Sequence, residues 1–220
     1  MLFDFGYTLF AHASLPATIA GCAARIGVAI TDEQAAIVAE RIDSAATAPE
    51  ELLHRRDFDA AVWSQRWKAL YSIADDVADG LGAAVYSSMH DPLEWVPYRN
   101  AASTLQALAS GGVRVGVISN TGWDVRRVFE AHSMSTFVGT FTLSYEVGSV
   151  KPEPRIFAAA CEALGLSHHD VLMVGDDPRS DGGAVATGLR TLLLPPAPQG
   201  SDNGLDSVLR LLASSSAKFR

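Results

Sequence analysis

The alternation of short apolar runs with helical patterns in the second half of the chain constrains the fold most. Helical patterns separate four apolar runs after residue 99, which we interpret as strands: VRVGVIS (113–119), FTLSY (141–145), VLMVGD (171–176) and RTLLL (190–194). The opening MLFDF reads as a fifth strand. Continuous apolar strands separated by helices are typical of a parallel sheet covered on both faces. The sequence therefore predicts a doubly wound, Rossmann-like α/β core.

Helical patterns alone fill the stretch between the first strand and the rest of that core. Thr31 and Gln34 have the spacing of a helix capping box, and Gly27 provides a stop for the helix before it. Apolar residues then recur at helical spacing up to about residue 90. We therefore predict an inserted all-helical cap domain over residues 13–96, with the α/β core formed by residues 1–12 and 97–220.

The charge balance limits the classes of partner. The chain carries a formal net charge of -8 without a cluster of Lys and Arg, so nucleic acids and anionic membranes are poor candidates. A small anionic substrate is compatible, because a metal ion or a few local cations can override the net charge. No apolar run reaches the roughly 20 residues of a membrane span, and no signal-peptide pattern is present, so we expect a cytoplasmic protein. The sequence gives no indication of the oligomeric state.

Polar residues stand where the predicted strands end. Asp4, Ser119 and Asp176 take these positions, Lys151 lies in the loop after FTLSY, and Asp181 opens the helix after Asp176. In open α/β sheets, ligands bind at the carboxyl ends of the strands. Two carboxylates about 4 Å apart repel by roughly 4 kcal/mol at an effective dielectric of about 20. A hard divalent cation such as Mg²⁺ relieves this repulsion, so the sequence predicts a magnesium site at this edge.

Four segments, in this order, resemble the sequence motifs of the haloacid dehalogenase superfamily: FDFGYTLF, VISNT, VKPEPRIF and MVGDDPRSDGGAVATGLRT. The helical insertion resembles the C1 cap of that superfamily. The resemblance implies a hydrolase, foremost a Mg²⁺-dependent phosphatase of a small phosphorylated metabolite. The resemblance also implies that Asp4 is the nucleophile and forms an aspartyl-phosphate. Ser119 and Lys151 would be catalytic residues that bind the phosphoryl group together with Asn120. The metal site would consist of Asp4, Asp176, Asp181 and the Gly6 carbonyl.

Position 6 departs from the pattern of those phosphatases. Most of them have a second aspartate two residues after the nucleophile, which acts as general acid and base. This chain has Gly6 there, followed by Tyr7 where glycine is usual. General acid–base catalysis typically contributes about 10²–10⁴ in rate. We therefore expect turnover of phosphates with good leaving groups, such as aryl or acyl phosphates, and slow turnover of alkyl phosphates.

Two other functions are compatible with the sequence. In a 2-haloacid dehalogenase, an aspartate attacks carbon and displaces halide without a metal. That function fits the missing second aspartate and the pair Ser119–Asn120, but it fits GDDPRSD poorly. The other alternative is a binding protein that keeps the fold with impaired catalysis. The joint presence of Asp4, Lys151 and Asp176 argues against it.

The remaining candidates are interpreted as structural. We expect Trp63 and Trp67, one helical turn apart, in the core of the cap. We expect His12 to be a solvated hinge residue and the run 54–56 (HRR) to be a solvated helix start. The two cysteines, Cys22 and Cys161, lack the spacing of a metal site or a disulfide framework, so they should be buried as small apolar side chains.

Overall fold

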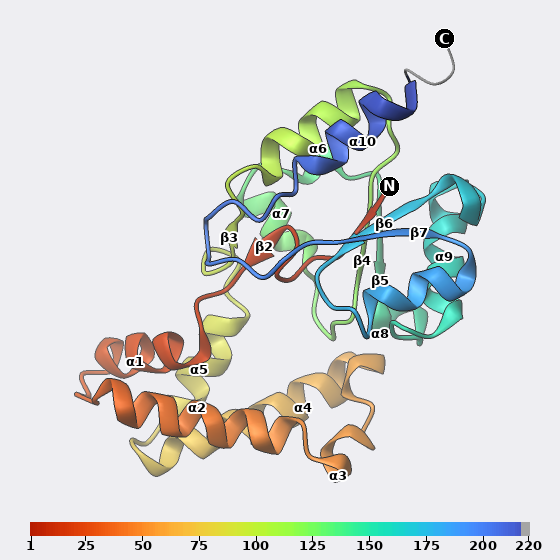
Figure 1. Ribbon diagram of the computed structural model, residues 1–220. Coiled ribbons are helices and arrows are strands. Elements are labelled where there is room, and N and C mark those ends of the chain that lie inside the picture. The colour runs from red at the N-terminus through yellow and green to blue at the C-terminus, as the bar shows by residue number, and fades with distance from the viewer. Residues whose placement is uncertain (217–220) are drawn as a thin grey trace.

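The computed structural model describes residues 1–216, and a five-stranded sheet forms its centre (Figure 1). The strands follow the order β5–β4–β1–β6–β7, and every neighbouring pair is parallel. Their bounds are Leu2–Phe3 for β1, Gly116–Ser119 for β4, Thr140–Leu143 for β5, Leu172–Gly175 for β6 and Arg190–Leu193 for β7. The predicted doubly wound sheet is therefore confirmed.

The first strand is short, but it lies in the middle of the sheet. Leu2 pairs with Gly116 of β4 on one side and with Met173 of β6 on the other. The backbone N–H of Asp4 continues this pairing by donating to the carbonyl of Val174 at 2.8 Å. Asp4 is therefore fixed at the carboxyl edge by neighbours on both sides of its strand.

Helices cover both faces of the sheet (Figure 1). Phe3 enters the hydrophobic cluster of one face together with side chains of α6, α7 and α10, whereas Leu2 enters the cluster of the other face with α9 and η5. The bounds are Ala101–Ser110 for α6, Arg126–Ala131 for α7, Ser207–Ser216 for α10, Pro154–Leu164 for α9 and Asp181–Thr187 for the 3₁₀ helix η5. Successive residues of a strand point to opposite faces, so even a two-residue strand contributes to both cores.

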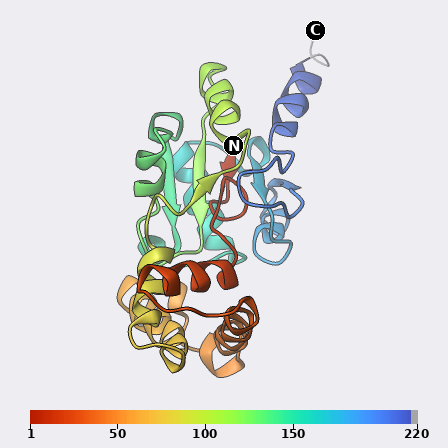
Figure 2. The same cartoon turned by 90° about the vertical axis from the view of Figure 1, so that its left-hand side faces the viewer.

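The helices between residues 15 and 89 form a separate body at one end of the sheet (Figure 2). Their bounds are Leu15–Arg25 for α1, Asp32–Ala46 for α2, Pro49–Leu52 for α3, Arg56–Phe58 for η1, Ala60–Tyr71 for α4, Ser72–Asp76 for η2 and Leu81–Met89 for α5. Of these, α1, α2, α4, η2 and α5 share a hydrophobic cluster, which includes Ile19, Ile42 and Val85. The predicted capping box is present at the start of α2. We propose that this body is the cap of residues 13–96.

Two short strands carry the chain between the cap and the core. β2 (Phe10–Ala11) pairs antiparallel with β3 (Val96–Pro97). Gln199, in the loop after β7, donates from Nε2 to the carbonyl of Ala11 at 2.9 Å and to that of Glu94 at 3.2 Å. A single side chain of the core therefore forms hydrogen bonds to both segments that connect the core to the cap.

Three elements differ from the sequence prediction. The helical spacing that runs up to about residue 90 is interrupted before Leu81, where α5 begins, because the chain first turns through Gly80 with φ +82°. The strand FTLSY ends at Leu143, where the short helix α8 (Ser144–Val147) begins. The segment 181–187 is a 3₁₀ helix rather than an α-helix, and it contains two adjacent glycines, which are poor α-helix formers. Two further 3₁₀ turns are η3 (Ser135–Phe137) and η4 (His168–Asp170).

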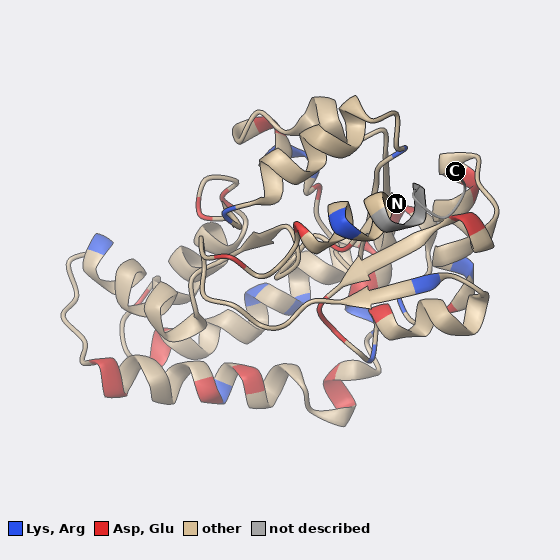
Figure 3. Cartoon of the chain, turned by 45° about the horizontal axis from the view of Figure 1, so that its top comes forward, with Lys and Arg blue, Asp and Glu red and all other residues tan. Residues whose placement is uncertain are grey.

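The surface and the cysteines agree with the sequence analysis. Lys and Arg are scattered along the ribbon rather than gathered on one element (Figure 3). Cys22 and Cys161 are free and buried, as predicted. Within residues 1–216, no helix combines the length and apolar character that a bilayer crossing requires.

Candidate active site

Three carboxylates meet at the carboxyl edge of the sheet. Asp4 directly follows β1, Asp176 directly follows β6, and Asp181 begins η5. One oxygen from each of the three lies within 4.8 Å of the others. The structure thus brings together three of the residues that the sequence assigned to a magnesium site.

Lys151 lies buried among these carboxylates. Its Nζ donates to Asp4 Oδ1 and to Asp181 Oδ1, each at 2.6 Å. Asn120 fixes the backbone of Lys151, because its Nδ2 donates to the Lys151 carbonyl at 2.9 Å and its Oδ1 accepts from the Lys151 N–H at 2.7 Å. Asn120 was predicted to bind substrate, and in this structure its amide holds the lysine in place. Both of its polar atoms are engaged there.

Asp181 organises the turn that carries Asp176. Its side chain is fully buried, and Oδ2 accepts from the backbone N–H groups of Asp176 and Asp177, each at 3.0 Å. A Cβ on Gly175 would overlap this carboxylate, so the last residue of β6 has room only for hydrogen. Asp181 therefore joins the lysine to the loop after β6.

At the carboxyl edge of the sheet, burial disfavours the ionised form of the carboxyl groups. Burial raises the pKa of Asp4 to about 7, although the charge of Lys151 opposes the shift. Burial also raises the pKa of Asp176, against the hydrogen bond that Thr8 Oγ1 donates to it at 3.0 Å. For Lys151, burial lowers the pKa, but the charges of Asp4 and Asp181 outweigh it and the net shift is upward. The site therefore favours a charged lysine.

This donor set fits a hard divalent cation. Three carboxylates face a single ammonium group, which leaves an excess of negative charge when all are ionised. Mg²⁺ prefers oxygen ligands and usually takes one or two carboxylates together with waters and phosphate oxygens. Asp4 and Asp176 both line the adjoining cavity, and so does Gly6. Asp181 is committed to Lys151 and two backbone amides, so we expect it to orient the site rather than to bind the ion directly.

A cavity of about 570 Å³ opens over the carboxylates, between the core and the cap. Ser119, at the end of β4, lines it together with Lys151 and Asn120, the residues that were predicted to bind the phosphoryl group. The cap contributes Trp63, Trp67, Tyr71, Met89 and His90. Trp67 packs against the hydrophobic cluster of the cap, as expected, and also lines the cavity, whereas Trp63 is not part of that cluster and the expectation was wrong for it. Both line the cavity, because α4 presents this side to the core.

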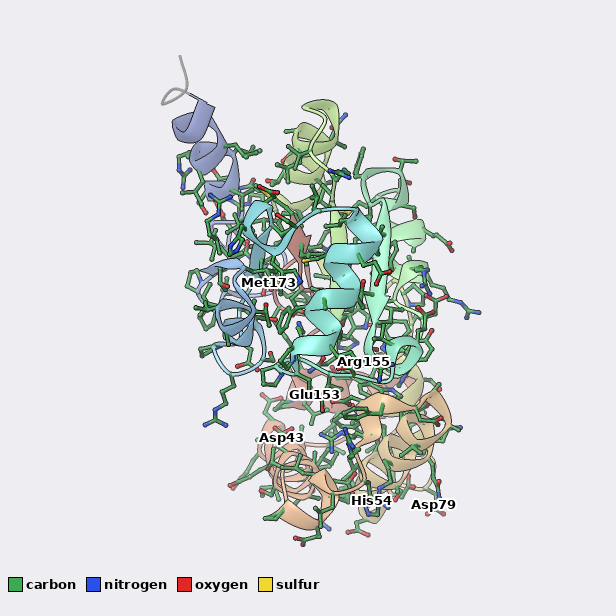
Figure 4. The ribbon with its side chains drawn as sticks, turned by 90° about the vertical axis from the view of Figure 1, so that its right-hand side faces the viewer. Asp43, His54, Asp79, Glu153, Arg155 and Met173 are labelled. Carbon is green, nitrogen blue, oxygen red and sulfur yellow. The ribbon has the colours of Figure 1, made fainter. Side chains whose placement is uncertain are left out.

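The cap contacts the core at the edge of the cavity. Ser144 Oγ of the core donates to the carbonyl of Asp57 in the cap at 2.6 Å. Arg55 pairs with Glu153 at 3.2 Å, and Figure 4 labels Glu153 at the end of α9 that faces the cap. A Cβ on Gly122, in the loop after β4, would overlap the side chain of Trp63. The structure thus shows the cap in direct contact with the core.

Two other expectations on the cap side are corrected. His12 is only 3% exposed and bonds to the Ser88 carbonyl at 3.2 Å, so it is a buried hinge residue rather than a solvated one. In the run 54–56, Arg55 is exposed as predicted, but the side chain of Arg56 is mostly buried and packs over Trp67. Neither arginine lines the cavity.

Sequence reasoning missed two further tryptophans of the cavity. Trp95 lies just before β3, and Trp123 lies in the loop after β4. The ring of Trp95 approaches Gly6, where an added Cβ would lie 3.7 Å from the indole. Trp123 follows the motif segment VISNT closely and Trp95 lies far from any motif segment, and nothing in their spacing distinguishes them from core tryptophans. Their role follows only from the packing of cap against core.

Known proteins with the same fold include both phosphatases and dehalogenases. The chain is 30% identical over 119 residues to phosphatase MT3486 of Mycobacterium tuberculosis, a match that covers 53% of each chain. It is 29% identical over 96 residues to (S)-2-haloacid dehalogenase 4A of Burkholderia cepacia, covering 43% of this chain and 42% of the relative. These matches therefore span about half the length of the curated relatives.

A solved structure gives the same picture of the fold over nearly the whole chain. L-2-haloacid dehalogenase from Xanthobacter autotrophicus superposes with a TM-score of 0.68 at 17% identity, over 96% of this chain and 97% of that one. A family model described as haloacid dehalogenase-like hydrolase matches residues 2–186. The chain belongs to the haloacid dehalogenase-like hydrolase family.

Proposed function

We propose that this chain is a Mg²⁺-dependent phosphatase of a small phosphorylated metabolite, with Asp4 as the nucleophile. The observation that carries the proposal is the convergence of three carboxylates around one buried lysine, with Asp4 and Asp176 facing the cavity. Such a set suits a divalent cation and an anionic substrate. When bound, the cation would supply electrostatic stabilisation of the charge that develops on the phosphoryl group.

The residues of this chain would act in two steps. The Asp4 oxygen that is not bound to Lys151 attacks phosphorus. The bond from phosphorus to the ester oxygen breaks, and its electron pair leaves with the organic group. Water then attacks the phosphorus of the aspartyl-phosphate and its proton passes to a phosphate oxygen. The bond from phosphorus to the Asp4 oxygen breaks, its electron pair returns to the Asp4 carboxylate, and inorganic phosphate is released. Ser119 and Lys151 would donate to the phosphoryl oxygens throughout.

The missing acid at position 6 limits the leaving group. Gly6 offers no proton, although a Cβ at this position would fit, at an ordinary contact distance of 3.7 Å from the ring of Trp95. Two titratable side chains of the cavity are poor substitutes. Partial burial and the charges of Asp176 and Asp43 raise the pKa of Tyr7, and burial lowers that of His90. The organic group must therefore leave as an anion. This requirement favours aryl and acyl phosphates over alkyl phosphates.

A metal-independent 2-haloacid dehalogenase is the second candidate. The relatives and solved structures with that printed activity favour it, and so does the absence of a second aspartate at Gly6. The cavity argues against it. Without a metal ion, the carboxylate of a 2-haloacid would have to be neutralised by Lys151 alone, because this is the one Lys or Arg among the described residues that lines the cavity. Lys151 already pairs with two carboxylates and has one N–H left to donate, whereas a phosphoryl group would also be held by the cation.

The test is a substrate panel with and without Mg²⁺. We expect the purified protein to release phosphate from phenyl phosphate in Mg²⁺, to stop in EDTA, and to lose activity as Asp4→Asn. Halide release from 2-chloropropanoate that persists in EDTA would instead establish the dehalogenase. Inactivity toward every compound would identify a binding protein.

A further inference from the structure

The wall of the cavity above the carboxylates is aromatic. All four tryptophans of the chain line it, and they do so from both the cap and the core. The ring centroids of Trp63 and Trp67 lie 5.6 Å apart, and those of Trp95 and Trp123 lie 6.4 Å apart. Tyr7 continues this wall, 6.4 Å from Trp95. We call these five side chains the aromatic box.

Tyr7 is held in an unfavourable backbone conformation. Its φ is +57°, in the left-handed region that bulky residues with a Cβ rarely adopt. Packing does not require the ring, because Tyr7 is 47% exposed. Such strained backbone conformations cluster at active sites and ligand clamps. The phenol of Tyr7 lines the cavity, so the aromatic box includes a residue that the fold alone would not select.

The box carries no positive charge. Among the residues that the structure describes, every Lys and Arg other than Lys151 lies outside the cavity lining. A second phosphate or a carboxylate on the substrate would therefore find no cationic partner there. The polar end of the cavity suits one phosphoryl group, and the rest of it suits an uncharged ring.

We propose that the substrate is the phosphate monoester of an aromatic alcohol, with no second anionic group, and that the aromatic box binds its ring. This inference rests on the proposed phosphatase activity. The ring lies against the box while Asp4 attacks phosphorus, and the phenolate leaves with the electron pair of the broken P–O bond. The phenolate then takes its proton from water. The same ring that the box recognises is thus the leaving group that needs no acid at Gly6.

Binding is tested with phosphonates, which have no ester bond to hydrolyse. Phenylphosphonate and methylphosphonate share the anionic group and differ in the ring. Titration in Mg²⁺ is followed by intrinsic tryptophan fluorescence, because every tryptophan lines the cavity. We expect phenylphosphonate to bind at least about tenfold more tightly, given the value of aromatic contacts and buried apolar area. Equal affinities would overturn the inference.

A matched pair of variants separates binding from folding. Tyr7→Gly removes the ring and relieves the positive φ, so the protein should remain folded while phenylphosphonate binds several-fold more weakly. Ser133→Gly relieves a similar φ of +56° at an exposed position outside the cavity. It should leave the affinity unchanged. If Tyr7→Gly bound phenylphosphonate as tightly as Ser133→Gly does, Tyr7 would have no place in the box.

Four substrates separate this inference from the proposed function. Phenyl and benzyl phosphate carry a ring, whereas acetyl and ethyl phosphate do not. Phenyl and acetyl phosphate have good leaving groups, and the other two have poor ones. We expect KM to follow the ring and kcat to follow the leaving group.

The outcomes of the two experiments point to different claims. Phosphate release with a KM that ignores the ring overturns the aromatic inference and keeps the phosphatase. Selective binding of phenylphosphonate without any phosphate release keeps the aromatic box and overturns the phosphatase. Absence of both binding and release overturns both.

Discussion

Replacing Lys151 by methionine tests whether the carboxylate cluster depends on its single ammonium group. The side chain of Lys151 is 2% exposed and donates to Asp4 and Asp181, each at 2.6 Å. Methionine has a similar length but no charge, so the variant leaves three carboxylates facing one another. Removing one partner of a buried ion pair typically costs about 3–5 kcal/mol.

The expected loss is large enough to measure by thermal unfolding. A chain of this size loses about 2–4 °C in Tm for each kcal/mol, so Lys151→Met should unfold about 6–20 °C lower in EDTA. Circular dichroism at 222 nm follows the transition. Mg²⁺ should restore part of the Tm, because a ligand that binds only the folded state stabilises it.

Lys68→Met is the matched control. Lys68 is exposed on α4, with its ammonium group 5.1 Å from the ring centre of Tyr86. Its removal should change stability by no more than about 1 kcal/mol. If Lys151→Met unfolded at the same temperature as this control, the buried ion pairs would not hold the site together.

Three further predictions concern the cavity. Gly6→Asp should raise kcat for ethyl phosphate by about 10²-fold or more in a steady-state assay, because it restores a general acid. An unchanged rate would show that protonation of the leaving group is not rate-limiting. Gly122→Ala should displace Trp63 and lower the free energy of unfolding by about 1–3 kcal/mol by overpacking. Limited proteolysis should then cut the segments between cap and core faster. A variant as resistant to the protease as the wild-type protein would contradict the close contact. Burial, assisted by the charge of Lys68, lowers the pKa of His90 below its ordinary 6.5. The unfolded chain therefore binds the extra proton more readily, so His90 should reduce stability as the pH falls below 6.5, and an NMR titration that placed its pKa at 6.5 or above would refute this.

The polar half of the site was predictable because it depends on topology. Asp4, Ser119 and Asp176 stand at the ends of apolar runs, and parallel strands bring such ends to one edge whatever their side chains. The sequence order of the motifs then placed Lys151 and Asp181 nearby. These positions needed no knowledge of side-chain packing.

The aromatic half was not predictable, because it depends on how the cap docks. Trp63 and Trp67 are one helical turn apart. This spacing suits a helix face inside the cap as well as a face that contacts the α/β core, so periodicity alone does not tell which face of α4 they occupy. Trp95 and Trp123 lie outside the helices of the cap, and nothing local marks them as neighbours. Tyr7 gave a weak signal, since a bulky residue replaced the expected glycine, but its left-handed conformation became visible only in the structure.

The amide of Gln199 has a consequence for motion of the cap. Because it pins the chain at Ala11 and Glu94, the dihedral changes of an opening movement must fall on the far side of those two points. The pivots are then confined to the few peptide units around residues 12–14 and 90–93, and the strand pair β2–β3 travels with the sheet. Amide hydrogen exchange should consequently be slow in β2 and β3 and fast just beyond them, and Gln199→Ala should shift the boundary between the two regimes toward the sheet.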